Sequence, residues 1–319
     1  MTFHVLVPDS VDQSAIDLLT AAEDITVEAP GKMARADLLN KIATTNAIII
    51  RSGVKADAEL LNAATELKFI ARAGVGVDNV DLAVATERGI VVMNTPDGNT
   101  VATAEHTFAI LLGLMRHVHT GHQSLAEGRW DRKNFEGNEL RGKTLGIVGF
   151  GRIGKAVAKR ALAFEMNVIT YDPYVMVEMA HEAGVEKVDL AGLFEYSDIL
   201  TLHTVITEAT LNMIDAEAIA RMKDGVRIVN AARGALIDEA ALADALDSGK
   251  VAGAALDVYS VEPPENNRLI GHPRVLHTPH LAASTEEAQT AVAVEAAEII
   301  IRAARYGIYT NVVNPDVLE

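Results

Sequence analysis

The chain has 319 residues, 49% of them hydrophobic and 23% charged, so it is long enough to build about two packed domains. Its formal net charge of −16 excludes a general binder of nucleic-acid phosphates, which needs a basic surface, and argues against adhesion to an anionic membrane. The sequence has no cysteine, which excludes disulfides and thiolate chemistry, and it begins without the basic-then-apolar layout of a signal peptide. We therefore expect a cytoplasmic protein without a metal site that binds neither nucleic acid nor membranes.

The first hundred residues alternate short apolar runs with helical stretches. Strands are expected at Phe3–Val7, Ala47–Ile50, Phe69–Ala71 and Ile90–Met93, and helices at about 12–22, 34–43, 57–64 and 80–88. This alternation is typical of a parallel sheet with helices on both faces. The loop 94–99, rich in chain-breaking residues, then marks the end of the first domain.

A second alternating series follows one long helix, which we expect from about 100 to 127. The apolar run Phe108–Met115 within that helix is too short to span a bilayer. Six strands are expected near 144–148, 167–171, 198–202, 226–230, 252–256 and 275–277. Six parallel strands fit a doubly wound dinucleotide-binding fold. The last helix, about Thr285 to Ala304, has no sheet left to extend, so we expect it to rejoin the first domain.

A glycine motif directly follows the apolar run Leu145–Val148. Gly149 permits a tight turn, Gly151 lets the backbone approach a pyrophosphate, and Gly154 lets the next helix pack close to the strand. The following strand ends at Asp172, where a carboxylate would bind the adenosine ribose and repel a 2′-phosphate. The motif therefore predicts a bound dinucleotide, NAD rather than NADP. The alternatives are a glycine-rich turn without a nucleotide, and an aspartate that only caps its turn.

Three segments at later strand ends carry polar side chains that suit one reaction. They are 228–234, 255–263 and 277–285, and they contain an arginine, acidic residues and a histidine. The carboxyl ends of parallel strands line the ligand crevice of such a fold. Reduction of a ketone needs a proton donor, for which histidine is suited, and an arginine can hold a substrate carboxylate. Among the ten histidines, His280 stands out at a strand end, whereas we interpret His106, His117, His119 and His122 as solvated or core residues of a helix.

These segments resemble the D-isomer-specific 2-hydroxyacid dehydrogenase family, and most of all its phosphoglycerate dehydrogenase branch. The resemblance covers nearly the whole chain. Its motifs are Ala73–Asp81, Asn94-Thr95-Pro96, the glycine motif, Asn230–Gly234, Glu262-Pro263 and Thr278–Leu281.

The resemblance implies a fold and a role for each matched residue. The fold would pair a discontinuous, flavodoxin-like substrate-binding domain (1–98 and 286–319) with a Rossmann NAD-binding domain (99–285). Arg233 would bind the substrate carboxylate and carbonyl, His280 would be the general acid and base, and Glu262 would tune His280. The NAD site would comprise Gly149, Gly151, Arg152, Ile153, Gly154, Asp172, Thr204, Ala231, Ala232, Asp257, Ala282 and Ala283. The substrate would contact Arg51, Arg72, Val75, Gly76, Asn99, Arg132, Arg233 and His280.

Basic residues in a net-acidic chain bear on the choice of substrate. Arg51 and Arg72 each follow a strand of the first domain, and Arg132 lies in a basic stretch that, in the resembled branch, reaches into the partner subunit's site. They favour a substrate with a phosphate and a carboxylate. The resemblance to the phosphoglycerate dehydrogenase branch implies that the reaction converts 3-phosphoglycerate to 3-phosphohydroxypyruvate, in serine biosynthesis. The alternative for the basic stretch is a solvated turn. The alternatives for the function are a broad 2-ketoacid reductase of the glyoxylate or hydroxypyruvate type and a non-catalytic NAD(H)-sensing protein.

The resemblance also implies a homodimer, formed through the region 100–142. Many members of the phosphoglycerate dehydrogenase branch carry a C-terminal regulatory domain. This chain stops about five residues after Asn314, so we expect a short form that lacks that domain.

Overall fold

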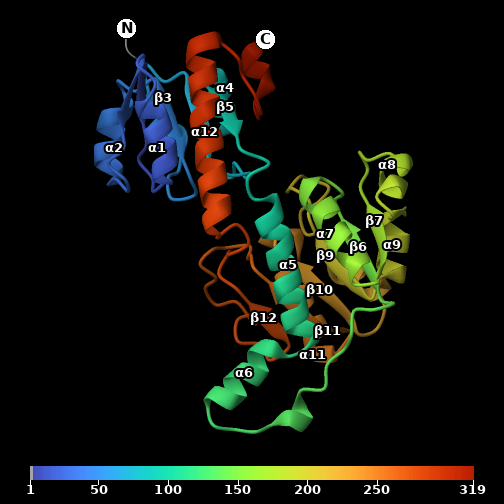
Figure 1. The fold of residues 1–319 in the computed structure, drawn as a ribbon. Helices are drawn as coiled ribbons and strands as arrows, with labels where there is room; N and C mark the ends of the chain where they lie inside the picture. Colours follow the sequence, from blue (N-terminus) through green and yellow to red (C-terminus); the bar gives the residue numbers. More distant parts are fainter. Residues whose placement is uncertain (1–2) are drawn as a thin grey trace. The chain divides into compact units, whose positions relative to one another are not determined.

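The computed structural model describes residues 3–319, which form two compact units. Unit 1 contains the chain up to Asn99 and again from Ser284, and unit 2 contains Thr100–Ala283. Each unit has its own parallel sheet with helices on both faces, so the predicted α/β class with two doubly wound domains is confirmed (Figure 1). Within the described residues, no helix combines the length and apolar character needed to cross a membrane.

Unit 1 is built on a five-stranded parallel sheet with the order β2-β1-β3-β4-β5, the flavodoxin-like arrangement. Its strands are β1 (Phe3–Leu6), β2 (Ile25–Glu28), β3 (Ala47–Ile50), β4 (Phe69–Arg72) and β5 (Val91–Asn94). Its helices are α1 (Gln13–Thr20), α2 (Arg35–Ile42), α3 (Ala58–Ala63), α4 (Leu82–Glu87), α12 (Glu286–Tyr306) and the 3-10 turn η3 (Pro315–Leu318). The sequence did not predict β2, an edge strand with little apolar signal.

The unit 1 sheet has a core on each face because successive strand residues point to opposite sides. Ile49 packs with α1 and α12 on one face, whereas Ile48 and Ile50 pack with α2, α3 and α4 on the other. Thr285 is the N-cap of helix α12, and its side chain accepts the Ala288 amide. The helix buries an alanine-rich face against the first sheet. The last helix therefore returns to the first unit, as the sequence predicted.

Unit 2 is built on a seven-stranded parallel sheet with the order β12-β11-β10-β9-β6-β7-β8, the dinucleotide-binding arrangement with one further strand. Its strands are β6 (Thr144–Val148), β7 (Asn167–Tyr171), β8 (Glu186–Lys187), β9 (Ile199–Leu202), β10 (Val226–Asn230), β11 (Val251–Leu256) and β12 (Val275–His277). Its helices are α5 (Thr100–Met115), α6 (Val118–Ala126), α7 (Arg152–Ala163), α8 (Val177–Glu182), α9 (Leu190–Tyr196), α10 (Ala216–Arg221), α11 (Glu239–Ser248) and the turns η1 (Arg132–Asn134) and η2 (Gly234–Leu236). The prediction of six strands missed β8, which has only two residues.

The single helix expected from about 100 to 127 is wrong, because the structure has two helices there. They meet at His117, which adopts a left-handed conformation with φ of 54°. The chain returns past this point, and the Asn138 amide donates to the Met115 carbonyl at 2.9 Å. A side chain on Gly137 would approach that carbonyl to 2.6 Å, so only glycine allows such close passage. The returning segment thus bonds to the Met115 carbonyl, which would accept an intrahelical hydrogen bond if the helix were continuous.

Candidate active site

The glycine turn after β6 lies where the strand order of unit 2 reverses, between β6 and β9. Gly149 has φ of +88°, and a Cβ at this position would lie 2.4 Å from the His203 carbonyl oxygen at the end of β9. A Cβ on Gly154 would lie 2.1 Å from the Gly149 carbonyl oxygen. Both glycines are therefore required for the ends of β6, β9 and α7 to meet this closely.

Gly151 differs from the other two glycines, because nothing lies within 4 Å of the position its Cβ would take. It is the N-cap of the twelve-residue helix α7, and its backbone opens onto free space. Main-chain amides at a helix N-terminus bind anions and are aided by the helix dipole. The turn thus fits a dinucleotide pyrophosphate, with Arg152 exposed and Ile153 half-buried in the first turn of α7.

Asp172 follows β7 and holds the turn around it. Its Oδ2 accepts the Phe150 amide and its Oδ1 accepts the Tyr174 amide, both at 2.8 Å. The aspartate therefore caps its own turn, as the alternative interpretation required. Two carboxylate oxygens offer about four acceptor positions, so ribose hydroxyls can bind as well.

The remaining cofactor candidates lie at strand ends of the same sheet or in the turns that follow them. Thr204 is half-buried after β9, Ala231 is buried after β10, and Ala232 is half-buried beside it. Ala282 is buried and Ala283 half-buried in the turn after β12.

His280 and Glu262 meet although they come from different strand ends. The His280 Nδ1 lies 2.7 Å from Glu262 Oε2, and the two side chains are 51% and 37% exposed. An ionised carboxylate only accepts, so Nδ1 carries the proton and Nε2 is left for exchange with a ligand. His280 also has a left-handed backbone with φ of 54°, and its amide donates to the Asp257 carbonyl at 2.8 Å. The exposed ring is thus held by one side-chain bond and by a fixed main chain.

Asp257 is fully buried after β11 and binds four donors. Its carboxylate accepts the Thr278 hydroxyl at 2.6 Å, the Leu281 amide at 2.7 Å, the Ala282 amide at 2.9 Å and His106 Nε2 at 3.1 Å. Burial pushes the pKa of Asp257 upward, but these hydrogen bonds outweigh it, so the pKa lies below its usual value. Asp257 is therefore ionised, and its hydrogen bonds hold the residues on both sides of His280.

Arg233 lies at the end of a turn that the Asn230 side chain stabilises by two hydrogen bonds. The Asn230 side chain donates to the Arg233 carbonyl at 2.8 Å and accepts the Ala232 amide at 3.0 Å. The Arg233 guanidinium donates to the Ala232 carbonyl at 2.7 Å. The turn therefore fixes the backbone from which the guanidinium extends.

Comparison with known proteins places this geometry in a family. Residues 108–282 match the model of the D-isomer specific 2-hydroxyacid dehydrogenase NAD-binding domain. The chain belongs to the D-isomer specific 2-hydroxyacid dehydrogenases.

Similar proteins are found by sequence and by structure. A D-3-phosphoglycerate dehydrogenase from Archaeoglobus fulgidus is 48% identical over 99% of this chain, which spans 60% of that relative's length. The crystal structure of a glyoxylate reductase from Paecilomyes thermophila has a TM-score of 0.90 at 32% identity and covers 98% of both chains. A formate dehydrogenase from Staphylococcus aureus, solved in complex with NAD, has a TM-score of 0.85 at 32% identity and covers 98% of this chain and 99% of its own. Unit 2 is therefore the part of the chain that matches the NAD-binding domain of this family.

The sequence interpretation missed one histidine of the candidate site. His106 on α5 bonds through Nε2 to both Asp257 and Thr278, each at 3.1 Å. Because the carboxylate only accepts, the His106 Nε2 carries the proton. No local pattern marks His106, since its partners lie 151 and 172 residues further along the chain.

His203 was also not considered, although it borders the glycine turn. Its Nε2 lies 2.9 Å from the Thr201 hydroxyl, while its Nδ1 is buried without a partner among the described residues. Burial lowers the pKa of His203 to about 3, so the ring is neutral at physiological pH.

The substrate candidates of unit 1 lie at the carboxyl ends of β3, β4 and β5, with Arg72 as the last residue of β4 and the others on the loops that follow. The Arg51 guanidinium donates to the Ser10 carbonyl at 3.0 Å, and Arg72 donates to the Ala73 carbonyl at 3.1 Å. Val75 and Gly76 are half-buried, and Asn99 buries an Oδ1 without a partner among the described residues.

Arg51 lies at the reversal point of the unit 1 sheet, between the ends of β1 and β3. Its amide and that of Gly53 both donate to Asp9 at the end of β1. Ligands of doubly wound sheets bind at such points. Arg132, in contrast, is exposed on η1 of unit 2.

Proposed function

We propose that this chain is an NAD-dependent dehydrogenase that interconverts 3-phosphoglycerate and 3-phosphohydroxypyruvate. The observation that carries the chemical part of the proposal is the 2.7 Å bond between His280 Nδ1 and Glu262. Similarity to the Archaeoglobus fulgidus enzyme, named D-3-phosphoglycerate dehydrogenase, supports the substrate.

The proton-transfer step follows from the His280–Glu262 pair. Glu262 holds the proton on Nδ1, so Nε2 gives a proton to the substrate oxygen in reduction and takes one in oxidation. Glu262 stabilises the imidazolium when both nitrogens are protonated. Arg233 binds the substrate carboxylate through its guanidinium fork and polarises the carbonyl.

NAD, when bound, supplies or accepts the hydride at C2 of the acid. The glycine turn holds its pyrophosphate on the amides of α7, and Asp172 binds the adenosine ribose. The space beside Gly151 and the acceptor positions on Asp172 support this assignment.

The phosphate of the substrate requires positive charge, which we assign to Arg51, Arg72 and Arg132. Unit 1 would then be the substrate-binding domain, with the Val75 and Gly76 amides binding the carboxylate. The position of Arg51 at the sheet reversal point supports this role.

A broad 2-ketoacid reductase is the second candidate, favoured by the likeness to a glyoxylate reductase. Replacement of Arg132 by alanine separates the two functions. It should weaken use of 3-phosphohydroxypyruvate far more than use of glyoxylate if the phosphate assignment is right. Equal losses on both substrates would favour the broad reductase.

We also propose that the chain forms a homodimer through α6 and the segment after it. This part of unit 2 extends away from the seven-stranded sheet (Figure 1). It exposes Val118 by 60%, Leu125 by 59% and Trp130 by 79%. Exposed apolar side chains of this size are typical of association surfaces. A cytoplasmic location belongs to the same proposal, and the cysteine-free sequence is compatible with it.

A panel of substrates tests whether the protein is an enzyme. NADH oxidation is followed with 3-phosphohydroxypyruvate, hydroxypyruvate, glyoxylate and pyruvate, and NADH binding is measured separately by fluorescence. We expect turnover with at least one 2-keto acid and the highest kcat/KM with 3-phosphohydroxypyruvate. Tight NADH binding without turnover across the panel would instead identify an NAD(H)-sensing protein.

A further inference from the structure

The loop that carries Glu262 has little apolar anchorage of its own. Ser260, Val261, Glu262 and Pro263 are all exposed. Nevertheless, Glu262 must stay within hydrogen-bond distance of His280 for the pair to act. A contact elsewhere in unit 2 therefore has to fix this loop.

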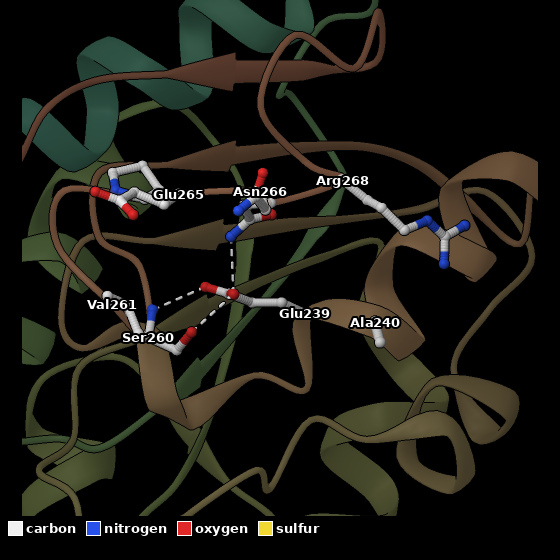
Figure 2. A pocket seen from close by; sticks show the side chains of 9 residues that line it. Glu239, Ala240, Ser260, Val261, Glu265, Asn266 and Arg268 are labelled. Carbon is white, nitrogen blue, oxygen red and sulfur yellow. Dashed lines mark hydrogen bonds between the residues drawn. The ribbon is translucent and has the colours of Figure 1, made fainter.

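Glu239, the first residue of α11, makes such a contact. Its Oε1 accepts the Ser260 amide, and its Oε2 accepts both the Ser260 hydroxyl and the Asn267 side-chain amide, each at 2.8 Å. Figure 2 shows the Glu239 carboxylate pointing from the helix toward Ser260. Glu239 thus joins α11 to two points on the loop, seven residues apart in the chain.

These three bonds are stronger than ordinary surface contacts. Each joins a neutral donor to an ionised carboxylate, and such charge-assisted bonds are about twice as strong as neutral ones. Glu239 is half-buried, and its neighbour Asp238 accepts the Ala240 and Ala241 amides, which fixes the helix start. The carboxylate therefore projects from a rigid base.

Gly234 holds the same part of the loop from another side. A Cβ at Gly234 would lie 1.8 Å from the Tyr259 carbonyl carbon and 2.3 Å from the Ser260 nitrogen. The peptide group between Tyr259 and Ser260 therefore rests directly on the backbone of Gly234, one residue after Arg233. This contact fixes the position of the turn that carries Arg233 relative to the loop that carries Glu262.

Two successive amides connect the Glu239 contact with the catalytic pair. The Ser260 amide donates to Glu239, whereas the Tyr259 amide donates to Glu262 Oε1 at 3.1 Å. Glu262 uses its other oxygen for His280. A shift of the Tyr259–Ser260 backbone would therefore move Glu262 relative to the histidine ring.

We propose that Glu239 is a positioning residue that holds Glu262 against His280 by fixing the loop between Tyr259 and Asn267. This positioning role rests on the proposed function, because it takes His280 as the proton-transfer group. The hydrogen bonds of the Glu239 carboxylate go to Ser260 and Asn267 and not to His280 or the proposed substrate residues, so Glu239 acts through the loop.

Kinetics of two Glu239 variants test the proposal. Glu239→Ala removes all three acceptors, and we expect kcat to fall about tenfold, a part of the roughly 10²–10⁴-fold that general acid–base catalysis contributes. KM for the keto acid and the affinity for NADH should stay within about twofold, because Arg233 and the glycine turn are untouched. Glu239→Gln keeps an acceptor for the Ser260 amide but opposes the Asn267 donor, so its kcat should lie between those of the alanine variant and the wild type.

Glu265→Ala is the matched control. Glu265 is exposed and lines the same pocket as Glu239, so its loss removes a carboxylate from this surface without removing the Ser260 contacts. We expect its kcat to equal that of the wild type. A loss equal to that of Glu239→Ala would overturn the proposal, since the effect would then follow the local charge.

A spectroscopic readout separates this proposal from the proposed function. In protein with 15N-labelled histidine, the His280 ring signals report which nitrogen carries the proton, and His280→Ala assigns them. We expect Glu239→Ala to shift these signals toward those of Glu262→Ala. Unchanged His280 signals would overturn the positioning role, whether or not the protein turns over a keto acid. If the wild type is inactive but Glu239→Ala still shifts the His280 signals, the result supports the positioning role and refutes the proposed function.

The alanine variant is not the only way to remove the contact. If Glu239→Ala does not fold, Ser260→Ala and Asn267→Ala each delete one side-chain donor to Glu239 and leave the helix intact. Their combination should lower kcat and shift the His280 signals in the same direction as Glu239→Gln. A double variant with wild-type kcat and signals would contradict the proposal.

Discussion

The strand ends of the two sheets are organised differently. In unit 2, side chains from distant segments bond to one another, as in the His280–Glu262 and His106–Asp257 contacts. In unit 1, the Arg51 and Arg72 guanidinium groups bond to nearby main-chain carbonyls. A side-chain network places a proton accurately, whereas a guanidinium bonded to main-chain carbonyls keeps its full charge for a ligand. We therefore expect changes in the His280–Glu262 and His106–Asp257 contacts to affect every substrate. Changes at the arginines assigned to the phosphate should instead discriminate among substrates, including Arg132 on η1 of unit 2.

The largest expected effect follows from removal of the proton-transfer group. His280→Ala should lower kcat by about 10²–10⁴-fold for all keto acids alike, the usual contribution of a general acid and base. NADH affinity, measured by fluorescence titration, should be unchanged because the glycine turn is intact. Full activity in this variant would refute the assignment, and a loss confined to one substrate would break the contrast between the units.

A smaller and selective effect is expected in unit 1. Arg51→Gln should lower kcat/KM for 3-phosphohydroxypyruvate by about 10- to 100-fold, since a hydrogen bond to a charged group contributes about 1.5–3 kcal/mol. Hydroxypyruvate, which lacks the phosphate, should lose less than about threefold. Lys68→Gln is the control, because it removes the same charge just before β4, at the opposite end of the sheet. Equal losses on both keto acids would remove Arg51 from the phosphate site.

Acid stability should depend on one buried histidine of unit 2, His203. The unfolded chain protonates His203 as the pH falls through about 6.5, but the folded chain does not until about 3, so folding stability is lost as the pH falls through this range. Between pH 6.5 and pH 5 the loss from His203 should be about 2 kcal/mol.

Denaturant unfolding of the wild type, His203→Gln and the exposed-histidine variant His181→Gln at these two pH values checks this expectation. The stability of His203→Gln should depend less on pH, while His181→Gln should follow the wild type. Identical pH dependence in all three proteins would show that His203 is not the group responsible.

The smallest expected effect concerns cofactor choice. Asp172→Ala should raise the use of NADP relative to NAD by about tenfold, equivalent to about 1.4 kcal/mol, because the carboxylate that repels a 2′-phosphate is gone. Asp172→Asn keeps one oxygen acceptor for the turn, so a similar change in that variant assigns the effect to charge. An unchanged ratio in both variants would leave Asp172 as a turn cap only.

Much of the fold was predictable because its strands are buried on both faces. Ala47–Ile50, Val226–Asn230 and Val275–His277 form strands over the residues that the sequence predicted. In contrast, β2 and β8 contain polar residues and have no continuous apolar run. Their edge position does not explain the difference, since β12 also lies at an edge of its sheet.

The site was predictable only where a motif marks it. The spacing after predicted strands indicates Gly149 and Asp172 as candidates, and the family resemblance indicates Glu262 and His280. The parts that were missed depend on long-range packing. The helix break at His117 arises from a segment about twenty residues further on, and the His106 contact with Asp257 joins residues 151 positions apart.

We expect unit 2 to perform the chemistry and the arginines to select a phosphorylated acid. The most direct test is the wild-type kcat/KM for 3-phosphohydroxypyruvate against that for hydroxypyruvate, measured with NADH at low and high ionic strength. We expect a preference for the phosphorylated substrate of about 10-fold or more, which decreases as salt screens the charges. Equal kcat/KM values for the two keto acids at both ionic strengths would contradict it.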